Sequence, residues 1–156
     1  MALIHNDILR QLRYAFNFSD ATMLEILKLG GFTIELPHLA NMLRKENDRN
    51  FVACSDSQLD AFLDGLIIYN RGPRENAGDS PVVISALTNN VILRKLRIAL
   101  EFKENDMLDI LQLAGISVSK SELGALFRKA GHRNYKECGD QFLRNFIRGL
   151  TLHFRK

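Results

Sequence analysis

One short stretch near the C-terminus holds the residue types that covalent chemistry would need, namely His132, Cys138 and Asp140. A cysteine beside a histidine can act as a nucleophile, because the imidazole accepts the thiol proton. The same pattern occurs 84 residues upstream, but with Asp48 in place of the histidine. A cysteine at the start of an amphipathic helix is more often a small buried apolar residue. We therefore expect no catalytic residue and no enzymatic activity.

The histidines and cysteines also lack the spacing of metal ligands. No two histidines are four residues apart, and Cys54 and Cys138 form no CxxC motif. Glycine-rich phosphate loops and the common hydrolase motifs are missing from the sequence as well. The sequence thus predicts no metal site and no cofactor, and two cysteines that stay reduced in a cytoplasm. The four histidines are His5, His38, His132 and His153.

Basic side chains are the remaining candidates for binding, since arginine and lysine contact phosphates and carboxylates. Their excess lies in the second half of the chain. Residues 90–156 contain 13 basic and 7 acidic side chains, whereas residues 1–72 contain 7 and 9. We expect a binding face formed by Arg94, Arg97, Arg128, Lys129, Arg133, Arg144 and Arg148.

The two halves are related by a tandem duplication. Residues 6–72 align with residues 90–156 without a gap, and 26 of the 67 positions are identical. Two interpretations of the repeated polar residues stay open. They form a doubled basic surface, or the repeated arginines pair internally with Asp56 and Asp140 and hold the loop before the fourth helix. The repeated polar pairs are Asn6/Asn90, Arg10/Arg94, Arg13/Arg97, Arg44/Arg128, Lys45/Lys129, Arg49/Arg133, Asn50/Asn134 and Asp56/Asp140.

Helical periodicity predicts four helices in each half and no strand. In the first half three of them cover about residues 6–17, 20–29 and 36–45, and the fourth begins at Ser55, which has the spacing of a capping box with Gln58. Gly65 and Gly149 lie within the fourth helices, where glycine usually marks a close helix contact. The predicted fold is all-α, a four-helix unit duplicated and packed as a pseudo-two-fold globule. We expect repeats at 1–72 and 90–156, joined by a linker at 73–89.

The two fourth helices carry different charges along one stripe. Where the first has Asp60 and Asp64, the second has Arg144 and Arg148. If the halves meet with these helices antiparallel, the aspartates face the arginines; otherwise the stripes drive self-association or leave the arginines for an anionic ligand. Two independent solvated faces are the alternative. The full stripes are Asp56, Asp60, Asp64 and Arg71 in the first repeat and Asp140, Arg144, Arg148 and Arg155 in the second.

Two segments of the second repeat resemble those of a known family. The segments are NVILRKLRIAL at 90–100 and FRKAGHRNYKECGDQFLRNFIRGL at 127–150. They are similar to the YehS-like family of small bacterial proteins, and the resemblance extends over nearly the whole chain. It implies a cytosolic bacterial protein from a family of unknown function, and it supplies no catalytic residue, cofactor or substrate.

These observations favour a non-enzymatic binding module whose arginine-rich face contacts nucleic acid, with RNA preferred over other polyanions. The alternative is a protein-interaction or self-association module that uses the aspartate and arginine stripes. Tyr14, Phe51 and Tyr135 could stack on bases beside the arginines, although their pattern favours a role in the core. No stretch of 18 apolar residues occurs, so we expect no membrane span and a cytoplasmic location.

Overall fold

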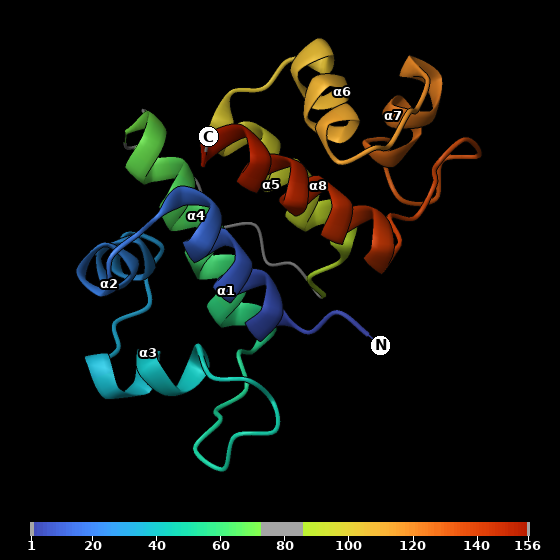
Figure 1. The fold of residues 1–156 in the computed structure, drawn as a ribbon. Helices are drawn as coiled ribbons and strands as arrows, with labels where there is room; N and C mark the ends of the chain where they lie inside the picture. The colour runs from blue at the N-terminus through green and yellow to red at the C-terminus, as the bar shows by residue number, and fades with distance from the viewer. Residues whose placement is uncertain (1, 73–85, 156) are drawn as a thin grey trace.

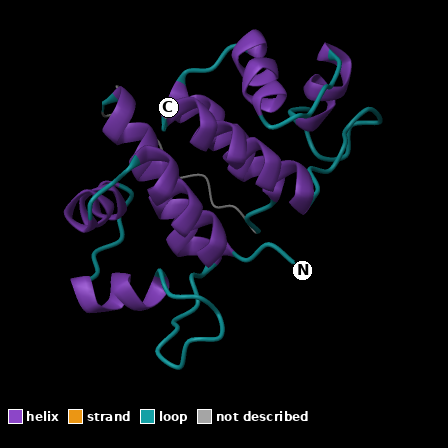
Figure 2. Ribbon diagram, viewed as in Figure 1, coloured by secondary structure: helices purple, strands orange, loops and turns teal. Residues whose placement is uncertain are grey.

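The computed structural model describes residues 2–72 and 86–155, which fold into eight helices with no strand among them (Figures 1 and 2). The all-α prediction and the duplicated four-helix unit are therefore confirmed. Most of the predicted linker, at residues 73–85, lies outside the described residues. The helices are α1 (His5–Phe16), α2 (Asp20–Leu29), α3 (Leu36–Met42), α4 (Asp56–Arg71), α5 (Asn89–Leu100), α6 (Glu104–Leu113), α7 (Lys120–Leu126) and α8 (Asp140–Phe154).

Side-chain caps fix where several helices begin. The Ser55 hydroxyl accepts a hydrogen bond from the Gln58 backbone at 3.2 Å, and the Gln58 side chain accepts one from the Ser55 backbone at 2.8 Å. Ser119 and Glu122 form the same capping box at the start of α7. Both boxes satisfy backbone N–H groups that a helix start would otherwise leave without partners.

Helix α3 ends at Met42 and is therefore three residues shorter than the predicted range of 36–45. The Asn6 side-chain amide, far away in the sequence, donates a hydrogen bond to the Met42 carbonyl at 2.8 Å. This contact takes an acceptor at the helix end, and the chain turns away after Leu43. A tertiary hydrogen bond of this kind has no local sequence signal, which is why periodicity extended the helix too far.

The first helix of each repeat packs mainly on the fourth helix of the other repeat. Helix α1 lies against α8, and α5 lies against α4, so these four helices form the centre of the molecule. Helices α2 and α3 flank α4 on one side, whereas α6 and α7 flank α8 on the other (Figure 1). The arrangement is a pseudo-two-fold globule in which each repeat completes the core of the other.

Glycine allows the fourth helix of each repeat to approach the second helix closely. A Cβ atom on Gly65 would collide with the carbonyl of Ile26 in α2. Likewise, a Cβ atom on Gly149 would collide with the carbonyl of Ile110 in α6. The predicted close helix contact is present at both positions, and it is the same contact in each repeat.

Candidate binding surface

Buried asparagines at the start of α1 and α5 hold the loop that carries many of the candidate side chains. The Asn6 amide donates to the carbonyls of Met42 and Val52, both at 2.8 Å, and its oxygen accepts from the Cys54 backbone at 2.9 Å. Asn90 makes the equivalent three hydrogen bonds in the second repeat. The repetition of this asparagine therefore has a structural reason, since it fixes the loop between the third and fourth helices.

The repeated aspartate at the start of α4 joins the two repeats. Asp56 Oδ1 lies 2.5 Å from His5 Nε2, and its Oδ2 accepts a hydrogen bond from the Leu87 backbone at 3.4 Å. The hydrogen bond from His5 is the main cause that lowers the pKa of the Asp56 carboxyl, and the Leu87 N–H adds to it. The predicted pairing with Arg44 or Arg49 does not form within the described residues.

Asp140 has the matching role at the start of α8. Its carboxylate accepts from the Asn89 side chain at 2.8 Å and from the Leu3 backbone at 3.1 Å. The Asn89 hydrogen bond, followed by the Leu3 N–H, lowers the pKa of the Asp140 carboxyl. Each aspartate thus binds the segment before the first helix of the opposite repeat, and the arginine partners expected from the sequence are again replaced.

The charged stripe of α4 faces α5, not the stripe of α8. Asp60 and Asp64 contact the Lys95 ammonium at 2.5 and 2.7 Å, so the alternative in which these carboxylates face Arg144 and Arg148 does not form. Residues of both stripes contact the opposite repeat, but the two stripes do not contact each other. They lie at the junctions between repeats, but each one opposes a first helix, because α4 packs on α5 and α8 packs on α1.

The ends of the two stripes contact backbone carbonyls of the opposite repeat. Arg71 Nη1 donates to the Ile98 carbonyl at 3.5 Å, and Arg155 Nη1 donates to the Tyr14 carbonyl at 2.9 Å. The Arg155 guanidinium also lies over the Tyr14 ring, 4.0 Å from its centroid. These two arginines are therefore bound within the molecule.

Arginines of the first repeat are neutralised by nearby carboxylates. Arg10 pairs with Asp7 at 2.6 Å, and Arg44 pairs with Asp48 at 3.3 Å. Arg13 also has a carboxylate partner, in α2. These three arginines of the first repeat therefore each have a carboxylate partner within the molecule.

The corresponding carboxylates near Arg94 and Arg128 are missing from the second repeat. Val91 occupies the position equivalent to Asp7, and His132 occupies the position equivalent to Asp48. The His132 ring keeps one contact of the aspartate, because its Nδ1 accepts from the Asn134 backbone at 3.0 Å. It thereby supports the turn without supplying the negative charge.

Five of the seven candidate residues lie together on α5 and on the loop that follows α7. Arg94 donates weakly to the Phe127 carbonyl at 3.5 Å, and the Arg97 guanidinium lies 4.7 Å from the centroid of the Phe127 ring. These contacts bring α5 beside the start of the loop. The side chains of the loop residues are exposed, without an ion pair or hydrogen bond within the described residues. We call this group the basic loop face; its members are Arg94, Arg97, Arg128, Lys129 and Arg133.

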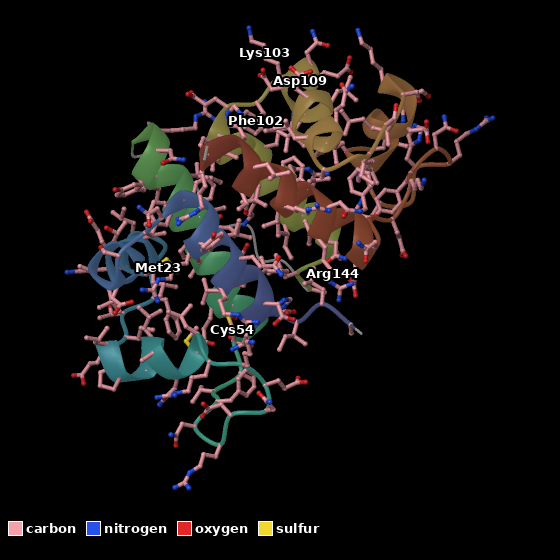
Figure 3. The ribbon with its side chains drawn as sticks, in the orientation of Figure 1. Met23, Cys54, Phe102, Lys103, Asp109 and Arg144 are labelled. Atoms are coloured by element: carbon pink, nitrogen blue, oxygen red, sulfur yellow. The ribbon has the colours of Figure 1, made fainter. Side chains whose placement is uncertain are left out.

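The other two candidates, Arg144 and Arg148, belong to the stripe of α8, the helix that packs on α1. Figure 3 shows Arg144 on the α1 side of α8. The Arg144 side chain contacts Gln141 at 3.4 Å, and its charge contributes to lowering the pKa of the Asp140 carboxyl. Arg148 is exposed. The seven residues therefore form two groups, although the sequence suggested a single face.

Cys138 lies in an environment that disfavours a nucleophilic role. Burial, with a smaller contribution from the negative charge of Asp140, raises the pKa of the Cys138 thiol to about 12. The thiol is therefore protonated at neutral pH, and only the thiolate is a strong nucleophile. It borders a cavity of about 130 Å³ with Leu123 and Phe142. Cys54 is buried in the same way, and burial also raises its pKa to about 12.

The described residues hold no group of three or more His, Cys, Asp or Glu side chains that could bind a metal ion. No helix among them is long and apolar enough to cross a membrane.

Comparison with known proteins places the chain in a family. The family model described as a protein of unknown function, DUF1456, matches twice, at residues 5–72 and 89–156. The uncharacterized protein YehS of Escherichia coli strain K12 is 41% identical over 151 residues, which cover 96% of this chain and 95% of the relative. No solved structure matches. The resemblance seen in the sequence is thus confirmed, and the chain belongs to the DUF1456 family, with two copies of the family's domain in tandem.

Proposed function

We propose that this protein is a non-enzymatic binding module that binds RNA through the basic loop face of its second repeat. The observation that supports the proposal is the loss of two carboxylates. Asp7 and Asp48 neutralise arginines in the first repeat, and Val91 and His132 stand at the equivalent positions of the second. Arg94 and Arg128 are therefore kept while the carboxylates equivalent to Asp7 and Asp48 are lost, as expected of a surface for an external anion.

The loop itself has changed in the same direction. Residues 44–50 contain three basic and two acidic side chains, whereas residues 128–134 contain three basic and no acidic side chain. Within residues 128–134, a phosphate group approaching the second loop therefore meets basic side chains and no carboxylate. Because bound phosphates release counterions, such binding should weaken steeply as salt is added.

A reciprocal pair of variants tests the proposal. His132→Asp adds a carboxylate beside Arg128, and its side chain can still accept from the Asn134 backbone, as Asp48 does from Asn50 at 2.8 Å. We expect RNA affinity to fall about three- to tenfold and the salt slope to decrease by about one. Asp48→His is the matched variant of the first repeat, and it should leave RNA affinity unchanged or slightly raised.

The measurement is fluorescence anisotropy with the full-length protein and a labelled RNA, over a salt series. Before it, the protein is recovered from a cell lysate at low salt and washed at high salt, and the released nucleic acid is quantified. No bound nucleic acid at low salt, together with no anisotropy change, would contradict the proposal. Binding that is insensitive to both salt and His132→Asp would also contradict it.

Assembly through the aspartate and arginine stripes is the second candidate, and it has less support. Asp60 and Asp64 already contact Lys95 within the molecule, so part of the acidic stripe is neutralised before a second copy could approach. If the stripes nevertheless drive assembly, reversing the charge at Arg148 should change the mass in solution. An unchanged mass by light scattering would remove this alternative.

A further inference from the structure

A cavity opens between α6 and the C-terminal end of α8. Its volume is about 460 Å³, within the range of roughly 300–1,000 Å³ that small-molecule sites occupy. Apolar side chains and two carboxylates of the second repeat line it, together with a histidine near the end of α8. The lining includes Phe102, Asp106, Asp109, Ile110, Leu113 and His153. None of these residues belongs to the basic loop face, so the cavity is a second candidate site.

The first repeat fills the equivalent space with an aromatic ring. Tyr69 of α4 packs edge-on against Phe18, with 5.9 Å between the ring centroids. The equivalent residues of the second repeat are His153 and Phe102, and both line the cavity. The His153 ring packs on Phe154 instead, with 4.7 Å between the centroids. A smaller ring that packs on a different neighbour thus leaves room beside Phe102.

The charge along the cavity has also changed between the repeats. The α6 side carries two carboxylates and no basic side chain, whereas the equivalent positions of α2 carry one of each. Residues 90–156 contain 13 basic and 7 acidic side chains, so a negative cavity is contrary to the charge of its own repeat. Such a cavity attracts a cation. The positions compared are Asp106, Asp109 and Gln112 in α6 and Thr22, Glu25 and Lys28 in α2.

The two carboxylates lie on one side of α6, because residues three apart in a helix are neighbours. Asp106 also has a structural role, since its Oδ2 accepts a hydrogen bond from the Lys103 backbone at 2.8 Å. Asp109 is exposed and lies in the middle of the helix, away from either end. Figure 3 shows it on the same edge of the second repeat as Phe102. The Asp109 carboxylate is therefore the group best placed to contact a bound cation.

The basic side chains of this region do not line the cavity. Arg97 Nε donates to the Phe102 carbonyl at 3.1 Å, and Lys120 pairs with Glu104 at 3.8 Å. Neither cation lines the cavity, and neither does Lys103, which is exposed. The two carboxylates on its α6 side are therefore left to a cation from outside the chain.

We infer that this cavity binds a small organic cation, in which a protonated amine or guanidinium is joined to an apolar group. The apolar group packs against Phe102 and Leu113, and the cation contacts Asp106 and Asp109. Among the described residues no three His, Cys, Asp or Glu side chains form a group that could hold a metal ion, so the complementary cation is organic. This binding is independent of RNA, because the basic loop face takes no part in it.

The test uses phenethylamine, a ring joined to a protonated amine, and phenylethanol, its neutral analogue of the same shape. Each probe is titrated into isotopically labelled full-length protein at about pH 8, where the amine is protonated, and the backbone amide resonances are followed by NMR. For an amine of this size we expect a dissociation constant on the order of 1 mM. The shifted resonances should belong to residues 102–113 and to the end of α8. Phenylethanol should bind about five- to tenfold more weakly.

Two variants of the cavity, each with a matched variant in the first repeat, separate charge from space. Asp109→Asn should weaken phenethylamine binding about two- to fivefold and leave phenylethanol binding unchanged, whereas Glu25→Gln should change neither. His153→Tyr restores the larger ring of the first repeat and should abolish the shifts caused by both probes. Tyr69→Phe keeps the ring of the first repeat and should leave both titrations unchanged. Thermal unfolding checks that each variant is folded.

Three results would overturn this assignment. The first is equal affinity for the amine and the alcohol, or an amine affinity that Asp109→Asn does not change, because the ligand would then need no cation. The second is amine binding that survives His153→Tyr or shifts resonances outside the cavity. The third is the lack of any shift at about ten times the expected dissociation constant. Amine-dependent shifts at the cavity that weaken in Asp109→Asn and vanish in His153→Tyr are the expected result.

Discussion

The two repeats have the same internal contacts and different surfaces. The asparagine, aspartate and glycine contacts that organise the first repeat recur in the second with equivalent partners. By contrast, the ion pairs of Arg10 and Arg44 have no counterpart, because Val91 and His132 replace the carboxylates. The repeats thus keep the contacts that hold the fold, whereas the carboxylates beside two exposed arginines have been replaced.

The comparison also separates two kinds of repeated polar residue. A repeated side chain that is buried or bridges the repeats needs no external ligand to account for it, as Asn6 and Asp56 illustrate. For a repeated side chain that is exposed and has lost its internal partner, the fold does not explain why the residue is the same in both repeats. Arg128 is the clearest case. Substitutions at equivalent positions can test this division, since the first class should behave alike in both repeats and the second should not.

The largest effect is expected at the buried asparagines. Asn6→Ala or Asn90→Ala leaves two carbonyls and one N–H without their partners, each in or near the core. Since an unsatisfied buried group costs about 1–3 kcal/mol, we expect the free energy of unfolding to fall by about 4 kcal/mol in either variant. Denaturant unfolding measures it. A loss in one variant only would break the equivalence of the two repeats.

The next largest effect is expected at the helix-contact glycines. Gly65→Ala and Gly149→Ala each place a methyl group against a backbone carbonyl that cannot move away without shifting a helix. We expect about 3 kcal/mol of destabilisation in both, at the upper end of overpacking effects. Gly124→Ala in α7 is the control, because a Cβ atom there meets no neighbour and alanine favours a helix by up to about 1 kcal/mol.

A smaller and asymmetric effect is expected at the two junctions. Lys95→Gln leaves Asp60 and Asp64 close together without a cation between them. The loss matters because the side chains of Lys95 and Asp60 are only 20% and 17% exposed. Allowing for solvent screening, we expect a loss of about 2 kcal/mol. Gln11, the equivalent residue of α1, has no such role, so Gln11→Ala should change the free energy of unfolding by less than about 0.5 kcal/mol. Equal losses at the two positions would contradict the assignment of the ion pairs to one junction.

The smallest effect concerns pH. The folded-state pKa values of Asp56 and Asp140 are lowered, so each carboxylate stabilises the fold above its unfolded pKa of about 3.9 and loses that contribution as pH falls through the lower folded value. Asp56→Asn and Asp140→Asn should be less stable than wild type at neutral pH, and the difference should shrink below about pH 4. Thermal unfolding over a pH series measures it, and a difference that grows in acid would contradict this sign.

Much of the fold followed from local patterns. The eight helices, the Ser55–Gln58 and Ser119–Glu122 caps and the close contacts at Gly65 and Gly149 all depend on residues near one another in the chain or on a single residue type. Which fourth helix packs on which first helix could not be predicted, because both choices bury the same apolar faces. The partners of Asp56 and Asp140 followed from that choice and were therefore missed.

The sequence predicted which basic residues are candidates for binding, but not how the structure divides them into two groups. Charge counts pointed to the second repeat, and they placed seven residues on one face, whereas the packing of α8 on α1 assigns two of them to a junction. The alignment of the repeats did contain a sign that the second loop lacks an ion pair of the first. Asp48 lies four residues after Arg44, a spacing that allows an ion pair, and its equivalent is His132.

The crossed packing of first and fourth helices has a consequence for how the chain is made. Contacts such as Leu3 with Asp140 and Tyr14 with Arg155 join residues 137 and 141 positions apart. Contacts this distant in sequence slow folding, since a large loop must close before they form. During synthesis α8 leaves the ribosome after the other described helices, so the face of α1 that packs on α8 stays uncovered until then. Until α8 is released, the nascent protein therefore exposes an apolar surface that is buried in the folded molecule.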